Sequence, residues 1–161
     1  MDKWKAFTGG AGAVLVPAFE FFYGPGDIVL LTMLALLFFI VLDWMSGVSA
    51  AKKDASYASR YGIDGVIRTF FMLLLPAGGH LLDKIFGLPG FVFGTLAFGT
   101  LYHVIQSMTA NTIRAGWSDW VPLPVLNLLI KWVKSELDQK IQRAESRKVV
   151  KEVPRNETGM D

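Results

Sequence analysis

The sequence contains no cysteine, which excludes disulfide bonds, thiolate metal sites and cysteine nucleophiles. Charged residues make up 19% of its 161 residues, against about a quarter in ordinary soluble proteins. No glycine-rich phosphate loop, no nucleophile with a base nearby and no pair of carboxylates within one apolar segment is present. The sequence therefore predicts a protein that is not an enzyme, with no catalytic residues, no metal site and no cofactor.

Apolar residues are abundant instead, at 52% of the chain with a mean hydropathy of +0.40. A bilayer core about 30 Å thick takes roughly 20 apolar residues of helix. We therefore predict an all-helical integral membrane protein with four apolar helical segments: Ala6–Tyr23, Ile28–Val48, Val66–Leu82 and Leu88–Ala110. The first contains Pro17 and Glu20, so three spans, with this segment in the interface, are the alternative.

The positive charges predict an orientation, because cytoplasmic loops carry an excess of Lys and Arg. With four spans, both termini lie in the cytoplasm and only Lys84 is external. With three spans, Lys3 and Lys5 move outside. No compact apolar stretch with a small-residue cleavage site precedes Glu20, so we expect the N-terminus to be retained.

The end of the chain differs from the apolar body. Half of its sixteen Lys and Arg residues lie between Lys131 and Arg155. After Val121–Pro124 breaks the chain, apolar residues recur at helical spacing: Leu126, Leu129, Ile130, Val133 and Leu137. This pattern predicts an amphipathic helix on the cytoplasmic leaflet, bound to anionic headgroups, with packing on a neighbouring tail as the alternative. The predicted domains are thus 1–113 transmembrane, 114–147 interfacial helix and 148–161 disordered charged tail.

Few polar residues fall within the apolar segments. Glu20, His103 and Gln106 do, and polar groups in lipid usually face another helix or water. For His103 and Gln106 we favour hydrogen bonds between helices over pore lining. His80 and Asp83 share a helix face at a spacing that a metal could use, but a polar cap at the external end of this segment is the stronger interpretation.

Small residues form two steps of the kind that lets helices approach closely in lipid. Gly90 and Gly94 form one, and Gly47 and Ala51 form the other. They predict close helix contacts, either within one protomer or in a homo-oligomer.

Several motifs in order along the chain resemble phage holin family 4, the phage-lysis and toxin-secretion holins of Gram-positive systems. The resemblance covers about residues 20 to 135. It departs at Val104 and Ala110, where the family commonly has glutamates. The matching positions are Asp43, Ser46, Gly47, Ala50, Ser59, Gly62, Gly65, Arg68, Asp83, Ser107, Asn111 and Gly116.

The resemblance implies a protein that accumulates in the bacterial cytoplasmic membrane as a homo-oligomer and permeabilises it. Endolysin or a secreted toxin would then leave the cell without necessarily binding the holin, and no nucleic acid is involved. We expect the tail to tune the timing and not to form the permeation path. The alternatives are a small membrane ion channel or transporter, and a membrane anchor whose tail recruits a cytoplasmic partner.

Overall fold

The computed structural model describes residues 2–54 and 59–152, and it describes side chains from Gly12 onward except at 55–61, 144 and 147–161. This part of the chain is helical and contains no strand, so the predicted all-helical fold is confirmed. The helices are α1 (Asp2–Tyr23), α2 (Asp27–Lys53), α3 (Ser59–Phe86), α4 (Phe91–Ala115) and α5 (Leu123–Glu152).

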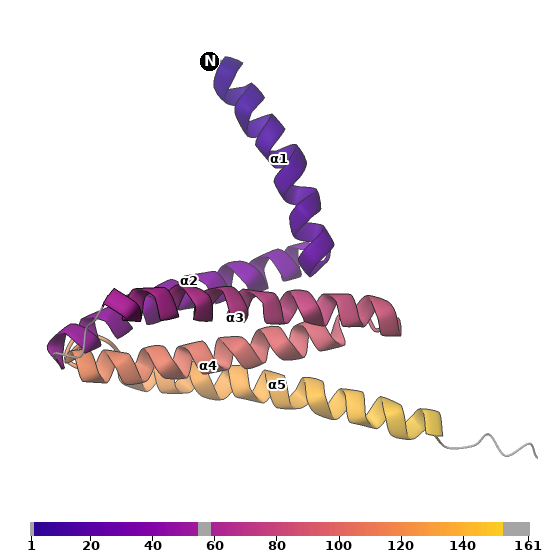
Figure 1. The fold of residues 1–161 in the computed structure, drawn as a ribbon. Helices are drawn as coiled ribbons and strands as arrows, with labels where there is room; N and C mark the ends of the chain where they lie inside the picture. The colour runs from indigo at the N-terminus through magenta and orange to yellow at the C-terminus, as the bar shows by residue number, and fades with distance from the viewer. Residues whose placement is uncertain (1, 55–58, 153–161) are drawn as a thin grey trace, which may run out of the picture.

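Helices α2 to α5 lie lengthwise beside one another, whereas α1 points away from them (Figure 1). Helix α4 is the central element, because it packs against α2, α3 and α5. The buried core lies along it, with Leu36 of α2 and Val104 and Ile105 of α4 fully enclosed. A change in α4 therefore affects every packed face of the bundle.

Among the described residues, three helices are long and apolar enough to cross a membrane: Asp27–Lys53, Gly62–Phe86 and Phe91–Ala115. The described side chains of α1, Gly12–Tyr23, form a shorter apolar stretch. The three long helices agree with the three-span alternative. Because the side chains of residues 2–11 lie outside the described part, the fourth span stays a prediction.

The outer surface of α2 and α3 is strongly apolar. Ile28 is 81% exposed, Phe70 64% and Phe71 63%. An exposed apolar surface of this kind is a liability in water but suits contact with lipid chains. These two helices are therefore built to lie in a bilayer.

The helices are longer than the apolar segments that predicted them. Helix α2 continues past Val48 to Lys53, and α3 begins at Ser59 and not near Val66. Hydropathy marks only the part of a helix that lies in lipid, while the helix itself continues until a turn or cap ends it. Helix α4 begins three residues later than predicted, because Gly87 (φ +64°) and Gly90 (φ +75°) form the preceding turn in the left-handed region.

Helix α5 packs on α4, whereas the sequence predicted it on the surface of the cytoplasmic leaflet. Val133 is buried in the core, and Leu126, Leu129 and Ile130 are partly buried against it. The predicted apolar stripe thus shares one buried face, but that face packs on α4 of the same chain and not on the leaflet surface. Periodicity shows that a helix has an apolar face and does not identify its partner.

The C-terminal boundary also differs from the prediction. Helix α5 continues to Glu152, so residues 148–152 are helical and not disordered, while 153–161 lie outside the described residues. Lys, Arg and Glu are good helix formers, so this helix continues without an apolar face.

Candidate functional site

A buried carboxylate joins the three long apolar helices. Asp43 of α2 is only 2% exposed. Its Oδ2 accepts a hydrogen bond and ion pair from Nη2 of Arg68 of α3 at 2.5 Å. Its Oδ1 accepts a hydrogen bond from Nδ2 of Asn111 of α4 at 3.0 Å. We call these three residues the Asp43 cluster.

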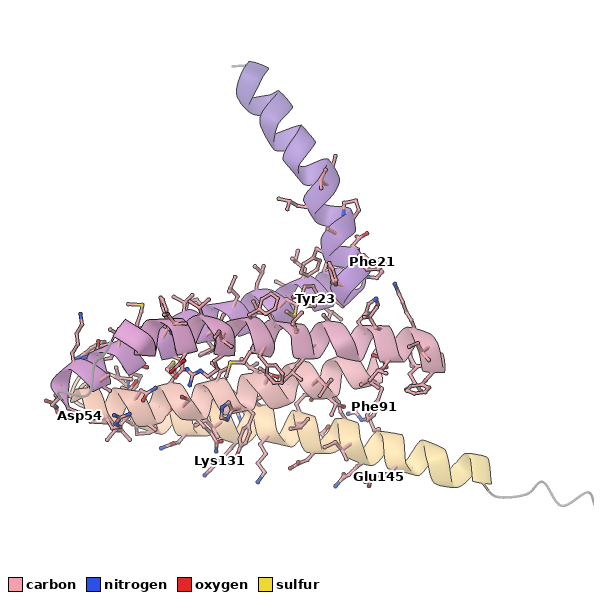
Figure 2. All side chains as sticks on the ribbon, viewed as in Figure 1. Phe21, Tyr23, Asp54, Phe91, Lys131 and Glu145 are labelled. Carbon is pink, nitrogen blue, oxygen red and sulfur yellow. The ribbon has the colours of Figure 1, made fainter. Side chains whose placement is uncertain are left out.

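The Asp43 cluster continues toward the end of the bundle. The Asn111 Oδ1 atom accepts a hydrogen bond from Arg114 Nη1 at 3.2 Å, and Arg114 Nη2 pairs with Asp54 Oδ2 at 2.7 Å. The chain of contacts runs from the buried Asp43 to the exposed Asp54, where α2 ends. Figure 2 shows Asp54 at the end of the bundle opposite Phe91. The charge that α2 buries is therefore compensated by polar groups of α3 and α4.

Small residues of α2 lie beside the cluster. Ser46, Gly47, Ala50 and Ala51 are all buried in the helix that packs against α4. The Ser46 hydroxyl donates to the Asp43 backbone carbonyl at 3.0 Å, so it is satisfied within its own helix. The predicted Gly47–Ala51 step is thus buried within the protomer.

Gly62 and Gly65, two of the positions that match the family resemblance, lie near the start of α3 and have different surroundings. A Cβ atom on Gly65 would overlap the Trp44 indole nitrogen, so glycine lets the tryptophan lie across α3. A Cβ atom on Gly62 would meet nothing within 4 Å. The side chain of Ser59, the other residue of this group, lies outside the described residues.

A second buried carboxylate holds the opposite end of the bundle. Asp83 of α3 is 3% exposed, and its two oxygens accept the backbone N–H groups of Val92 and Phe93 at 2.8 Å each. These N–H groups belong to the first turn of α4, where they have no partner within the helix. Asp83 therefore caps α4 from the neighbouring helix.

His80 and Asp83 contact different parts of the structure. A Cβ atom on Gly24 would lie 2.8 Å from the His80 ring, so the histidine packs against the turn between α1 and α2. Within the described residues, no group of three or more His, Cys, Asp or Glu side chains is placed to hold a metal. The polar-cap interpretation of this pair thus agrees with the geometry of Asp83.

Loss of this cap should be measurable. Replacing Asp83 with alanine leaves two N–H groups in the first turn of α4 without their partner. We expect a loss of about 1–2 kcal/mol in the free energy of unfolding, typical of a removed N-cap. Thermal unfolding in detergent measures it, and Asp83→Asn, which keeps one acceptor oxygen, should lose less. Equal stability of Asp83→Ala and the unaltered protein would contradict the cap.

The three polar residues for which the sequence predicted partners in other helices or water, Glu20, His103 and Gln106, face outward. Glu20 of α1 and His103 and Gln106 of α4 are exposed, and Ser107 is half-buried. The Gln106 amide donates to the Tyr102 hydroxyl of its own helix at 2.8 Å. The predicted inter-helix hydrogen bonds of His103 and Gln106 are thus not found within the described protomer.

The two glycines of the Gly90–Gly94 step have different roles. Gly94 is buried, and a Cβ atom there would lie 3.3 Å from the Lys140 ammonium nitrogen of α5. Gly90 precedes α4 in the left-handed region, and a Cβ atom there would meet nothing within 4 Å. Gly94 therefore faces α5 at a close contact within the protomer, whereas Gly90 serves the turn, and a contact of Gly90 between protomers stays a prediction. Gly116 likewise ends α4 with φ +78°.

Sequence reasoning missed two contacts. One is the Arg114–Asp54 pair, whose only signal was a cation and an anion at the ends of two apolar segments. The other is Lys140, whose ammonium lies 5.2 Å from the centre of the Phe98 ring. Nothing in the periodicity of a charged tail pointed to a residue in the first half of α4.

The chain is similar to uncharacterized proteins of three other organisms. The chain is 28% identical over 116 residues to an uncharacterized protein of Halalkalibacterium halodurans. This alignment covers 71% of the chain and 79% of that protein. It is 29% identical over 121 residues to an uncharacterized protein of Listeria innocua and 28% identical over 121 residues to one of Listeria monocytogenes. Each of these two alignments covers 75% of this chain and 80% of the relative.

No solved structure matches the chain. The model of the bacteriophage holin family matches residues 18–134, which include α2, α3, α4 and the part of α5 that carries most of the apolar stripe. This match covers well over half of the sequence and contains both buried carboxylates. The protein therefore belongs to the bacteriophage holin family.

Proposed function

We propose that the protein is a holin that accumulates in the bacterial cytoplasmic membrane, associates with further copies and permeabilises it. Endolysin, or in another genetic context a secreted toxin, then leaves the cell. The observation that carries this proposal is the family match across all three helices that are long enough to span a membrane. Family membership also favours a membrane protein without enzymatic activity.

The protomer is suited to a harmless first stage. The outer surface of α2 and α3 is apolar, and the Asp43 cluster compensates the buried charge inside the bundle. Every spanning helix also satisfies its own backbone groups. Single copies can therefore accumulate in lipid without opening a path, and permeabilisation requires their association.

The charges at the ends of the three long helices support one orientation. The ends of α2 and α4 that carry Lys52, Lys53 and Arg114 lie together, since Arg114 pairs with Asp54 just after α2. Lys84 lies at the other end of the bundle, in the last turn of α3. The excess of cations on cytoplasmic loops supports placing the Asp54 end in the cytoplasm and the Asp83 end outside.

Induced expression in a bacterium tests the proposed function. We expect growth to continue for a time and the membrane potential then to collapse abruptly, because opening depends on the number of copies. With a co-expressed muralytic enzyme that has no export signal, the cells should lyse at that moment. Membrane potential and released enzyme are measured together.

Cells that express the muralytic enzyme alone are the control and should not lyse. Continued growth with a graded, ion-selective flux would support a small channel instead. Normal insertion without any change in potential would refute the proposal.

A further inference from the structure

Helix α5 runs back along α4, from the end of the bundle that we place in the cytoplasm to the end that we place outside. The Lys140 ammonium nitrogen lies 3.3 Å from where a Cβ atom of Gly94 would stand, in the first turn of α4. Figure 2 shows Glu145 of α5 at the same end of the bundle as Phe91 of α4. If α4 crosses a membrane while α5 is docked on it, α5 therefore has to cross as well.

Helix α5 is unsuited to that crossing. Among the described residues it is not one of the helices that are long and apolar enough to span a bilayer. Lys131, Lys134 and Asp138 are exposed on it, and charged side chains are costly in hydrocarbon. Crossing would also carry these six cations to the outer end: Lys140, Arg143, Arg147, Lys148, Lys151 and Arg155. Docking of α5 on α4 and the passage of α4 through lipid therefore exclude each other.

The apolar side of α5 is wider than the face that α4 covers. Val133 is buried in the core, whereas Val125, Leu128 and Trp132 are 59%, 45% and 64% exposed. At about 100° per residue, these three continue the apolar stripe on one side, so apolar residues cover about half of the helix circumference over residues 123–133. One neighbouring helix leaves much of this side uncovered, whereas a flat apolar layer would cover all of it.

The surface of a bilayer offers such a layer. Asn127, Lys131 and Lys134 lie on the opposite side of α5, where headgroups and water would meet them. Trp120, just before the helix, is 68% exposed, and like Trp132 it has the type of side chain that settles at headgroup depth. The two lysines complement anionic lipids, which are the attractive partner for cations at the cytoplasmic leaflet.

The connection between α4 and α5 can act as the pivot. Residues 116–122 contain no helix, and the connection begins at Gly116, whose φ of +78° ends α4. A few loop residues can absorb a large change of direction between two intact helices. Helix α5 can therefore leave α4 without unfolding.

We propose that α5 leaves α4 when α4 crosses the membrane, and that its apolar side then lies on the cytoplasmic leaflet with Lys131 and Lys134 beside anionic headgroups. This inference rests on the proposed placement of α4 across the membrane and adds a second position for α5. In the first position, α4 shields the apolar stripe from water. In the second, the leaflet takes over that role and the charged end of α5 stays in the cytoplasm.

Thiol labelling separates the two positions, because the native chain has no cysteine. Cells that express the full chain with Ser146→Cys or, separately, Lys84→Cys are treated with a membrane-impermeant thiol reagent before the membrane potential falls. We expect Ser146→Cys to react several-fold less than Lys84→Cys, since the two thiols lie on opposite sides of the membrane. After the cells are opened, both should react equally.

Equal labelling in intact cells would overturn the inference, because the end of α5 would then lie outside with Lys84. That result would not touch the proposed function, provided that the cells still lyse with the muralytic enzyme. Cells that insert the protein but never lyse would refute the proposed function, and the labelling would still decide the position of α5.

Vesicles of defined composition test the leaflet site. The purified full chain carrying Ser135→Cys, at the border between the polar and apolar sides of α5, is labelled with an environment-sensitive dye. It is reconstituted in vesicles of phosphatidylglycerol or of phosphatidylcholine. We expect the emission to be shifted to the blue in phosphatidylglycerol, and high salt should reduce the shift because it screens the lysines.

Charge reversal provides the matched control for this measurement. Replacing Lys131 and Lys134 with glutamate should remove most of the difference in emission between the two lipids. Lys84→Glu makes the same type of change at the other end of the bundle and should keep the difference. Emission that does not depend on the charge of the lipid would overturn the leaflet site.

Discussion

Replacing Arg68 with leucine is expected to cost about 3 kcal/mol of stability. Asp43 is only 2% exposed and would keep its charge. Of the two described partners of its carboxylate, Arg68 and Asn111, only the Asn111 amide would stay. Removing one member of a buried ion pair typically costs about 3–5 kcal/mol because it leaves an uncompensated charge. The low end applies here, since the Arg68 side chain is itself 45% exposed.

Asp43→Asn tests whether the loss in Arg68→Leu comes from the uncompensated charge of Asp43. The neutral amide needs no counter-charge, and Arg68 can turn to water, so the loss should be smaller than for Arg68→Leu. Adding Asp43→Asn to Arg68→Leu should recover part of the stability, which a double-mutant cycle in detergent measures by thermal unfolding. Strict additivity of the two changes would show that Arg68 and Asp43 do not interact.

A methyl group added at Gly79 should have an effect opposite to one added at Gly78. At Gly79, a Cβ atom would lie 2.9 Å from the backbone N and Cα of Phe93, which cannot move without shifting α4. We expect Gly79→Ala to cost about 1–3 kcal/mol, the usual range for overpacking. At Gly78 nothing lies within 4 Å, so Gly78→Ala should gain up to about 1 kcal/mol from helix propensity.

The two variants differ by one position in the same helix and carry the same chemical change. Thermal unfolding of each in the same detergent, at equal abundance, separates the local contact from general effects of alanine. A Gly79→Ala protein as stable as Gly78→Ala would show that α3 and α4 are not in close contact at this turn.

The apolar helices could be predicted because the bilayer imposes a length and a composition that hydropathy measures directly. Their ends could not, since polar helical turns outside the lipid have no such signal. Asp43 and Asn111 are 68 residues apart, and although both match the family resemblance, no pattern in the sequence pairs them. Their meeting depends on how α2 and α4 pack, which local periodicity does not contain.

The two glycines of the Gly90–Gly94 step illustrate the same limit. Their spacing predicts one shared helix face, but Gly90 lies just before the helix begins and serves a turn with positive φ. Spacing has a structural meaning only where both residues are in the same helix. The start of α4 depends on the cap from Asp83, which no pattern near Gly90 indicates.

The two buried carboxylates lie at opposite ends of the α3–α4 pair. Asp83 attaches the start of α4 to α3, and the Asp43 cluster attaches the other end of both helices to α2. A hairpin fastened at both ends resists sliding and splaying of its two arms, so it behaves as a strut. If copies of the protein assemble and open as proposed, the elements outside this strut carry the rearrangement. These are α1, which points away from the bundle, and α5, which adheres through an apolar stripe. Substitutions that alter the delay before the membrane is permeabilised should accordingly lie mostly in α1 and α5. Substitutions that prevent the protein from accumulating in the membrane should lie mostly in the strut.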